Sequence, residues 1–158
     1  MISDKLAELL TDQIGSELGA SQNYMAIEFY FRHQSLDKWG DLFKDQAEEE
    51  FHHARKIMDF LVDVGVKFEL PSVGKAGVRF SSAEDAVASA LKSEQKVSGQ
   101  FRTMASVALE EDDYTSFQFL QWFISEQVEE ERKMQSLVDL VKSGINLFQA
   151  EALLESYK

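Results

Sequence analysis

Four glutamates and one histidine carry the chemistry that this sequence suggests. Glu50 and His53 form a Glu-x-x-His pair, which on a helix places both side chains on one face, within reach of a single metal ion. Glu17, Glu94 and Glu130 lie in three other segments, each within a row of mostly apolar residues. Carboxylates with a single imidazole are typical ligands of iron or manganese and, less specifically, of zinc. The pattern predicts a metal centre built mainly from carboxylates.

The rows that carry these residues have the alternating four- and three-residue spacing of helices that pack against one another. Pro71 is the only proline, so long helices can form without interruption. We expect long helices and one short C-terminal helix, over residues 4–33, 37–64, 82–110, 114–143 and 147–156. No segment alternates with period two for long enough to indicate a strand. The sequence therefore predicts an all-α protein with a single domain spanning residues 1–158.

The lengths of the connections predict the topology. The first and second helices, and the third and fourth, are joined by only a few residues, which favours two antiparallel hairpins. The connection near residues 64–82 is longer and contains Gly65, Pro71 and Gly74. About 15 extended residues reach about 50 Å, whereas a helix of about 28 residues is about 42 Å long. This segment can run the length of the molecule, which predicts a four-helix bundle with one long crossover.

In such a bundle the midpoints of the four helices share one level, and each helix has a glutamate there. Four buried carboxylates of like charge would unfold a marginally stable domain. They must be protonated, paired with cations, or wrongly assigned to the buried rows. Two divalent ions would offset four glutamates, and a neutral imidazole adds a ligand without adding charge. The alternative is that the register of each helix is misassigned and the glutamates are partly exposed. That alternative requires four misassigned registers, all at the same level of the bundle.

Several residues near this level have supporting or open roles. Gln13 and Gln46 are expected either to support the ligands or to lie in the solvated part of the bundle. Tyr24 and Trp122 are interpreted as packing residues with a hydrogen bond in preference to redox participants. Beside the buried rows lies an acidic cluster that is either a solvated face or a further cation site, comprising Glu49, Glu126 and Glu129.

Composition excludes several classes of function. The 158 residues include 16 basic and 28 acidic side chains, a formal net charge of -12, which disfavours nucleic acid and anionic membranes as partners and favours cations. Cysteine is absent, which excludes disulfides, Cys-ligated zinc, iron–sulfur clusters and thiol catalysis. No segment is apolar over the roughly 20 residues that span a bilayer, and the first residues do not resemble a signal peptide. A cytoplasmic location is expected.

Over essentially the whole chain, the sequence resembles the non-haem ferritins of bacteria and archaea. The resemblance rests on Glu17, Glu94, the run from Gln46 to His53, and the stretch 119–131 with its Leu-Gln-Trp, Ser-Glu-Gln and Glu-Glu elements. It implies that one iron is held by Glu17, Glu50 and His53. A second iron is then held by Glu50, Glu94 and Glu130, with Glu50 bridging. The resemblance also implies roles for two residues beside the centre. Gln127 would hydrogen-bond to bound oxygen or water, and Tyr24 would donate an electron.

The same resemblance implies the larger function. Fe(II) is oxidised by O2 or H2O2 and stored as a ferric mineral in a hollow shell of 24 subunits, whose four-fold channels are lined by the short last helix. A third iron site would use Glu49, Glu126, Glu129 and Glu130. Haem is not expected, because Phe51 occupies the position where the haem-containing bacterioferritins have a methionine. The fourth helix also has Gln127-x-x-Glu130 instead of a second Glu-x-x-His pair.

Three other classes compete with this interpretation. A rubrerythrin-like di-iron oxidoreductase or peroxidase would oxidise without storing mineral, but the cysteine-free chain lacks the rubredoxin-type iron site that usually feeds electrons to rubrerythrins. A structural or signalling bundle such as a cytokine is disfavoured by the charged buried rows. A miniature twelve-subunit ferritin places its iron ligands at a dimer interface and lacks the fifth helix.

Overall fold

The computed structural model describes residues 2–76 and 79–158, and the predicted all-α fold is confirmed. Met1, Gly77 and Val78 of the predicted single domain lie outside the described residues. The five α-helices and one 3₁₀ helix are α1 (Asp4–Arg32), α2 (Asp37–Asp63), α3 (Ala83–Glu110), α4 (Tyr114–Lys142), α5 (Leu147–Ala150) and η1 (Glu151–Tyr157). Each long helix begins and ends within one residue of its predicted bounds. No helix in this described part of the chain is long and apolar enough to cross a membrane.

The short C-terminal helix predicted over residues 147–156 is present and consists of two parts. Only Leu147–Ala150 is α-helical, and Glu151–Tyr157 forms a 3₁₀ helix. A segment this short gains little from helix propagation, and 3₁₀ turns are frequent at helix ends. The tail packs against α2 and α4 of its own chain.

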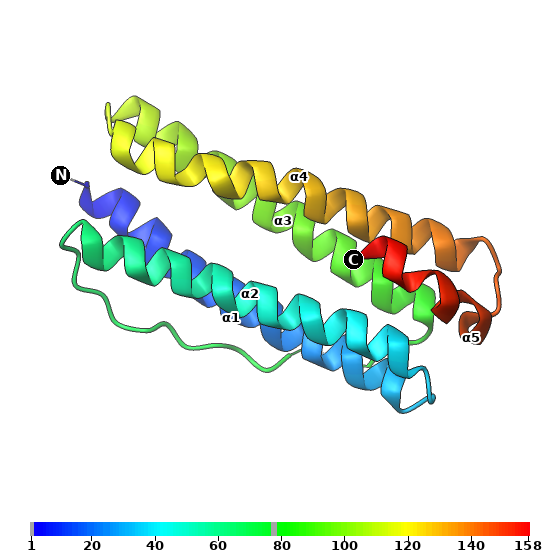
Figure 1. Ribbon diagram of the computed structural model, residues 1–158. Helices are drawn as coiled ribbons and strands as arrows, with labels where there is room; N and C mark the ends of the chain where they lie inside the picture. The colour runs from blue at the N-terminus through cyan, green and yellow to red at the C-terminus, as the bar shows by residue number, and fades with distance from the viewer. Residues whose placement is uncertain (1, 77–78) are drawn as a thin grey trace.

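The helices form the predicted bundle of two hairpins. Helices α1 and α2 run antiparallel, as do α3 and α4, and α1 also packs against α3 (Figure 1). The segment between α2 and α3 runs along the side of the bundle from one end to the other, so α2 and α3 point in the same direction (Figure 1). This arrangement aligns the midpoints of all four long helices.

Helix starts follow from capping side chains, with one exception. Ser3, Ser82 and Asp113 each accept a hydrogen bond from a backbone N–H in the first turn of α1, α3 and α4. Helix α2 starts at Asp37 as predicted, but Leu36 before it has no side chain that can cap. Glu151 of η1 supplies the cap, because its Oε2 accepts from the backbone N–H groups of α2's first turn. The tail therefore closes the end of the bundle.

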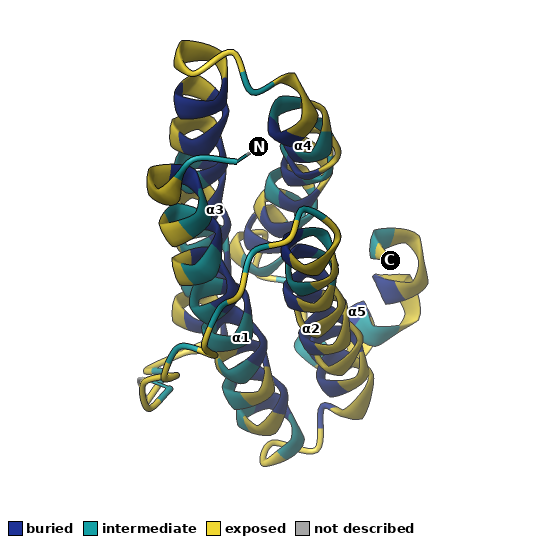
Figure 2. Cartoon of the chain, turned by 90° about the vertical axis from the view of Figure 1, so that its left-hand side faces the viewer, coloured by how far each residue is buried: buried dark blue, intermediate teal, exposed yellow. Residues whose placement is uncertain are grey.

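The apolar core is divided into two parts, with a polar layer between them. Buried faces run the length of each long helix (Figure 2). One part contains stacked aromatic rings at the α1–α2 turn, including Phe31, Trp39 and Phe43. The other lies at the opposite end and includes Leu10, Ile57, Phe101 and Phe123. The polar layer is placed where the sequence predicted it.

The buried row of α2 departs from the prediction near its end. Phe60 and Val64 continue the predicted spacing but are only half-buried, whereas Leu61 is fully buried. A straight α-helix has 3.6 residues per turn, so a row with a strict mean spacing of 3.5 drifts away from the facing helices. The drift is small at the middle of the helix, which is why Glu50 and His53 are buried as predicted.

The crossover is fitted to a glycine of α1. A Cβ atom added at Gly15 would lie 3.0 Å from Cγ of Pro71, whereas one at Gly19, one turn further along α1, would meet nothing within 4 Å. We expect Gly19→Ala to stabilise the protein by about 0.5–1 kcal/mol through helix propensity. Gly15→Ala should lose that gain, because Pro71 must move. The thermal midpoints of the two variants test this, and equal midpoints would show that the crossover is not held at Gly15.

Candidate metal centre

Five ionisable residues from four helices meet in the polar layer. Glu17 comes from α1, Glu50 and His53 from α2, Glu94 from α3 and Glu130 from α4, and each is at most 5% exposed. The predicted convergence of these side chains is therefore present in the structure. Their ligand atoms form two groups in which all atoms lie within 4.8 Å of one another: Glu17, Glu50 and His53, and Glu50, Glu94 and Glu130. Because both groups contain Glu50, the layer consists of two adjoining groups of potential metal ligands that share a carboxylate.

Two atoms of the first group are buried without a hydrogen-bond partner, Oε2 of Glu17 and Nδ1 of His53. They lie 3.8 Å apart, and the same Nδ1 lies 3.3 Å from Oε2 of Glu50. A buried polar atom without a partner costs about 1–3 kcal/mol, and more when it is charged. A cation held between these atoms would use their lone pairs together. The donor set of oxygen and imidazole nitrogen suits iron and comparable divalent ions.

Burial disfavours charge on the carboxylates of the second group. It raises the pKa of Glu50 well above its usual value, and it also raises the pKa of Glu94. Burial, followed by the charges of Glu94 and Glu49, raises the pKa of Glu130 to about 8. Without a metal ion, this group therefore retains protons that exposed glutamates lose.

The first group behaves differently because it contains the imidazole. Burial opposes a charge on His53, but the contacts with Glu17 and Glu50 outweigh it and raise the pKa of His53 to about 11. Burial likewise opposes ionisation of Glu17, yet its contact with His53 leaves the pKa of Glu17 lowered. In the metal-free protein, the positively charged imidazolium of His53 therefore provides the charge that a metal ion would otherwise provide beside Glu17 and Glu50. Binding of a metal ion to Nδ1 must release this proton.

Polar side chains hold the carboxylates in place. Gln13 and Gln46 have the predicted supporting role: Nε2 of Gln13 donates to Oε1 of Glu17 at 3.0 Å, and Nε2 of Gln46 donates to Oε2 of Glu130 at 2.6 Å. The hydroxyl of Tyr24 donates to Oε1 of Glu94. Tyr24 is thus a packing residue with a hydrogen bond, as expected, and that bond joins it to the centre.

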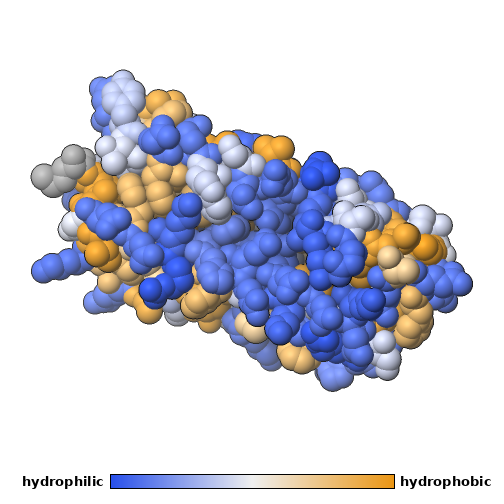
Figure 3. Space-filling model, viewed as in Figure 1, coloured by the Kyte–Doolittle hydropathy of each residue, from blue (hydrophilic) through white to orange (hydrophobic). Residues whose placement is uncertain are grey.

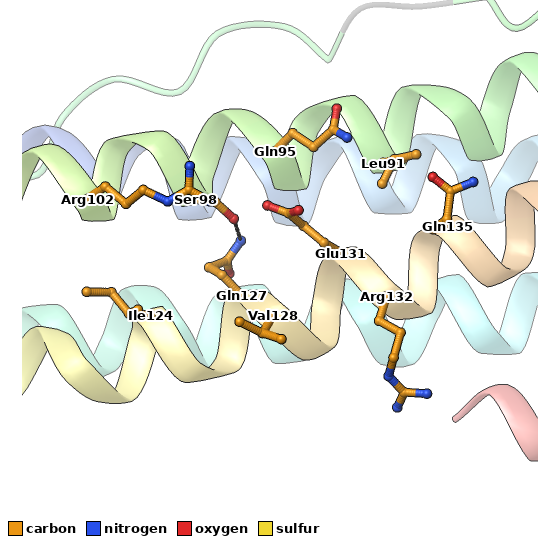
Figure 4. Close-up of a pocket in the computed structure, with 10 residues that line it drawn as sticks. All are labelled: Leu91, Gln95, Ser98, Arg102, Ile124, Gln127, Val128, Glu131, Arg132 and Gln135. Carbon is orange, nitrogen blue, oxygen red and sulfur yellow. Dashed lines mark hydrogen bonds between the residues drawn. The ribbon is translucent and has the colours of Figure 1, made fainter.

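Gln127 joins the centre to an external groove. Its Nε2 lies 3.0 Å from Oε2 of Glu94. The same Nε2 lies 3.3 Å from Oγ of Ser98, the contact drawn in Figure 4. A groove of about 430 Å³ between α3 and α4 is lined by both Gln127 and Ser98, which are its buried members. A single amide side chain therefore separates this groove from the carboxylate layer.

The acidic cluster beside the layer forms a wider site. Glu49, Glu126 and Glu129 share a cavity of about 240 Å³ with Glu130. Glu49 and Glu129 are exposed, and Glu126 is half-buried. Within residues 2–76 and 79–158, three or more such residues bring their ligand atoms within 4.8 Å of one another only in the two buried groups, so this third cluster is more open.

Two residues near the centre differ from what their sequence positions suggested. Trp122 is 40% exposed. Its ring contacts the ring of His53 edge-on, with 5.4 Å between the centroids, and Nζ of Lys56 lies 3.7 Å from the Trp122 ring centroid. Lys133 was not expected at the centre, yet its Nζ donates to Oε1 of Gln46 at 2.8 Å. The spacing from Glu130, three residues earlier on the same helix face, was the available signal.

Fold and site together define a four-helix bundle with two buried groups of carboxylate and histidine side chains that could each hold a metal ion. Comparison with known proteins agrees, since residues 7–143 match the family model described as a ferritin-like domain. Ferritin BfrB of Mycolicibacterium smegmatis is 40% identical over 151 residues, covering 95% of this chain and 83% of that protein. The bacterial non-heme ferritin of Staphylococcus aureus is 34% identical over 139 residues, covering 88% and 84%. The chain belongs to the ferritin family.

A solved structure extends the likeness to the whole fold. An open pore ferritin from the hyperthermophilic archaeon Archaeoglobus fulgidus superposes with a TM-score of 0.94 at 27% identity, covering 98% of this chain and 97% of that chain. The resemblance drawn from the sequence is therefore confirmed at the level of family and fold, and family membership supports iron storage as the function.

Proposed function

We propose that this protein stores iron by oxidising Fe(II) at the buried centre and depositing the product as a ferric mineral. The observation that carries the proposal is the sharing of Glu50 between two groups of ligand atoms in the buried layer. Two adjacent sites allow two Fe(II) ions to react with one oxidant molecule. A bundle without metal chemistry would have no reason to bury four carboxylates at one level.

Each ion has an assigned set of ligands under this proposal. Glu17, Glu50 and His53 bind the first Fe(II), and Glu50, Glu94 and Glu130 bind the second. Four carboxylates balance the charge of two divalent ions, whereas the imidazole loses its proton and binds as a neutral ligand. Carboxylate oxygens are hard ligands and favour Fe(III) over Fe(II), so they favour the direction of the reaction.

The oxidation is balanced by O2 as a two-electron acceptor. Each Fe(II) loses one electron, and O2 with two protons becomes H2O2; with H2O2 as oxidant, two electrons and two protons give two molecules of water. Gln127 can donate a hydrogen bond to oxygen or water at the centre, since its amide already faces Glu94. Tyr24 hydrogen-bonds to the same carboxylate and is positioned to supply a further electron.

Oxidised iron must leave the centre for storage. We assign a third cation position to the cavity formed by Glu49, Glu126, Glu129 and Glu130, which adjoins the second ion through Glu130. The face of the molecule in Figure 3 is hydrophilic across its middle, with apolar side chains nearer both ends. A polar, acidic face of this kind suits the nucleation of a ferric mineral.

Storage requires a closed assembly, and we propose the 24-subunit shell implied by the family resemblance, located in the cytoplasm. A groove between α1 and α2 is lined by three large apolar side chains that are 43–52% exposed, Met25, Phe29 and Phe51. A second copy of the chain covers this groove in the proposed shell, and no haem is required there. Size-exclusion chromatography with light scattering tests the assembly, because 24 copies of 18.0 kDa give about 430 kDa and twelve give half of that.

The proposed centre is tested most directly by anomalous diffraction from crystals soaked anaerobically in Fe(II). We expect two iron peaks, one beside Glu17 and His53 and one beside Glu94, with Glu50 between them. A single peak, or peaks confined to the exposed acidic residues, would overturn the assignment. Oxidation by the same protein without growth of a mineral would instead support the di-iron oxidoreductase alternative.

A further inference from the structure

Lys133 places a positive charge beside the buried carboxylates. It follows Glu130 by three residues on α4 and is half-buried. Its side chain lines the cavity that contains Glu49, Glu126 and Glu129. Lys133 is therefore in the same cavity as the proposed third cation position.

Lys133 also fixes the orientation of Gln46. A lysine ammonium is only a donor, so the Gln46 atom at 2.8 Å from its Nζ must be the carbonyl oxygen Oε1. The amide nitrogen Nε2 must then face the metal ligands, where it donates to Glu130 at 2.6 Å and lies 3.4 Å from Oε1 of Glu50. Reversing the amide would place donor against donor at Lys133.

The same ammonium acts on the cavity by its charge. Arg132 and Lys158 also line this cavity, but of the three basic residues it is Lys133 that bonds to Gln46. A divalent cation that enters among Glu49, Glu126, Glu129 and Glu130 therefore meets positive charge that is already there. Like charges within one cavity of this size repel each other, although solvent that reaches the exposed glutamates weakens the repulsion. To relieve the repulsion, Lys133 must swing away, which breaks its hydrogen bond to Gln46 and frees the amide that holds Glu130.

We propose that Lys133 is a specificity-determining residue that keeps the third cation position weak, so that the centre holds two ions tightly and a third only in passing. The inference deepens the proposed function and rests on it. A weak third position favours transfer of iron onward, because an ion there is not retained. It also couples occupancy of the cavity to the position of Glu130 through Gln46.

Anaerobic calorimetric titration of the assembled protein with Zn2+ tests the proposal. We expect two tight ions per chain and a third that binds at least about tenfold more weakly. Lys133→Leu, and Lys133→Gln as a second variant in case the first does not fold, should tighten the third ion by about tenfold or more. Lys133→Arg retains the charge and should behave as the unchanged protein. Lys142→Leu is the matched control, because it removes one lysine from the same helix far from the cavity.

The outcomes separate this inference from the proposed function. An unchanged third affinity in both neutral variants, or an equal gain in Lys142→Leu, would overturn the role of Lys133. Anomalous diffraction at the zinc edge should place the added ion of Lys133→Leu among Glu49, Glu126 and Glu129. Absence of zinc from the two buried groups would instead overturn the proposed centre itself.

Discussion

Glu50→Ala is expected to lower the initial rate of Fe(II) oxidation by more than about 100-fold. Glu50 belongs to both groups of ligand atoms, so its removal opens both sites at once. Loss of a residue that only orients a ligand already costs about 10–100-fold in metal affinity or activity. Stopped-flow absorbance after mixing the protein with Fe(II) in the presence of oxygen measures the effect.

The fold should survive this substitution. Burial raises the pKa of Glu50, so ionisation of this carboxyl disfavours the folded state when no metal is bound, and the substitution gives up only its contacts with neighbours such as His53. The matched control is Glu48→Ala, an exposed glutamate two residues earlier on the same helix. We expect the control to oxidise Fe(II) at the unchanged rate and both variants to assemble. A fast phase that persists in Glu50→Ala would show that oxidation takes place elsewhere.

The metal-free protein is expected to lose thermal stability as the pH rises from 5.5 to 8.5. The folded-state pKa values of Glu130, about 8, and of His53, about 11, both lie above the unfolded values of 4.5 and 6.5. Over this range the folded chain binds more protons than the unfolded chain, so the free energy of unfolding falls with pH. The His53 contribution is complete below pH 6.5 and is lost as the pH approaches 11. A drop in thermal midpoint on the order of 5–10 °C is expected.

Bound metal should reverse this dependence. A divalent ion replaces the protons on the buried groups, so it binds more tightly at higher pH and stabilises the folded state by mass action. Differential scanning calorimetry of the assembled protein, with and without Zn2+, measures both effects. Glu130→Gln removes one of the buried groups with a raised pKa and should make the fall between pH 5.5 and 8.5 shallower. A metal-free midpoint that rises with pH would contradict the protonation of the buried layer.

These expectations follow from the opposition between charge and burial at the middle of the bundle. The two apolar parts of the core stabilise the fold, whereas the layer between them destabilises it unless protons or metal ions are bound. Stability and metal binding are thus properties of the same five side chains. Metal occupancy of the proposed centre should therefore change the thermal midpoint of the protein as well as its rate of Fe(II) oxidation.

The sequence by itself determined the four helices, the crossover and the five residues of the buried layer. Long amphipathic rows specify both the helices and the faces that pack together. Because the four helices are similar in length, Glu17, Glu50, Glu94 and Glu130 lie at one level of the bundle. These are local patterns repeated over many residues, so a drift such as that at Phe60 and Leu61 does not disturb the centre.

The tertiary structure alone decided the contacts between residues distant in the chain. The cap of α2 comes from Glu151, more than a hundred positions further on, and the Gly15 contact comes from Pro71. The bond between Lys133 and Gln46 likewise joins α4 to α2. Helical periodicity indicates the face of the helix on which a side chain lies. Hydrogen bonds between helices depend instead on side-chain rotamers and on the distance between the helix axes. Those quantities are fixed only when the bundle packs.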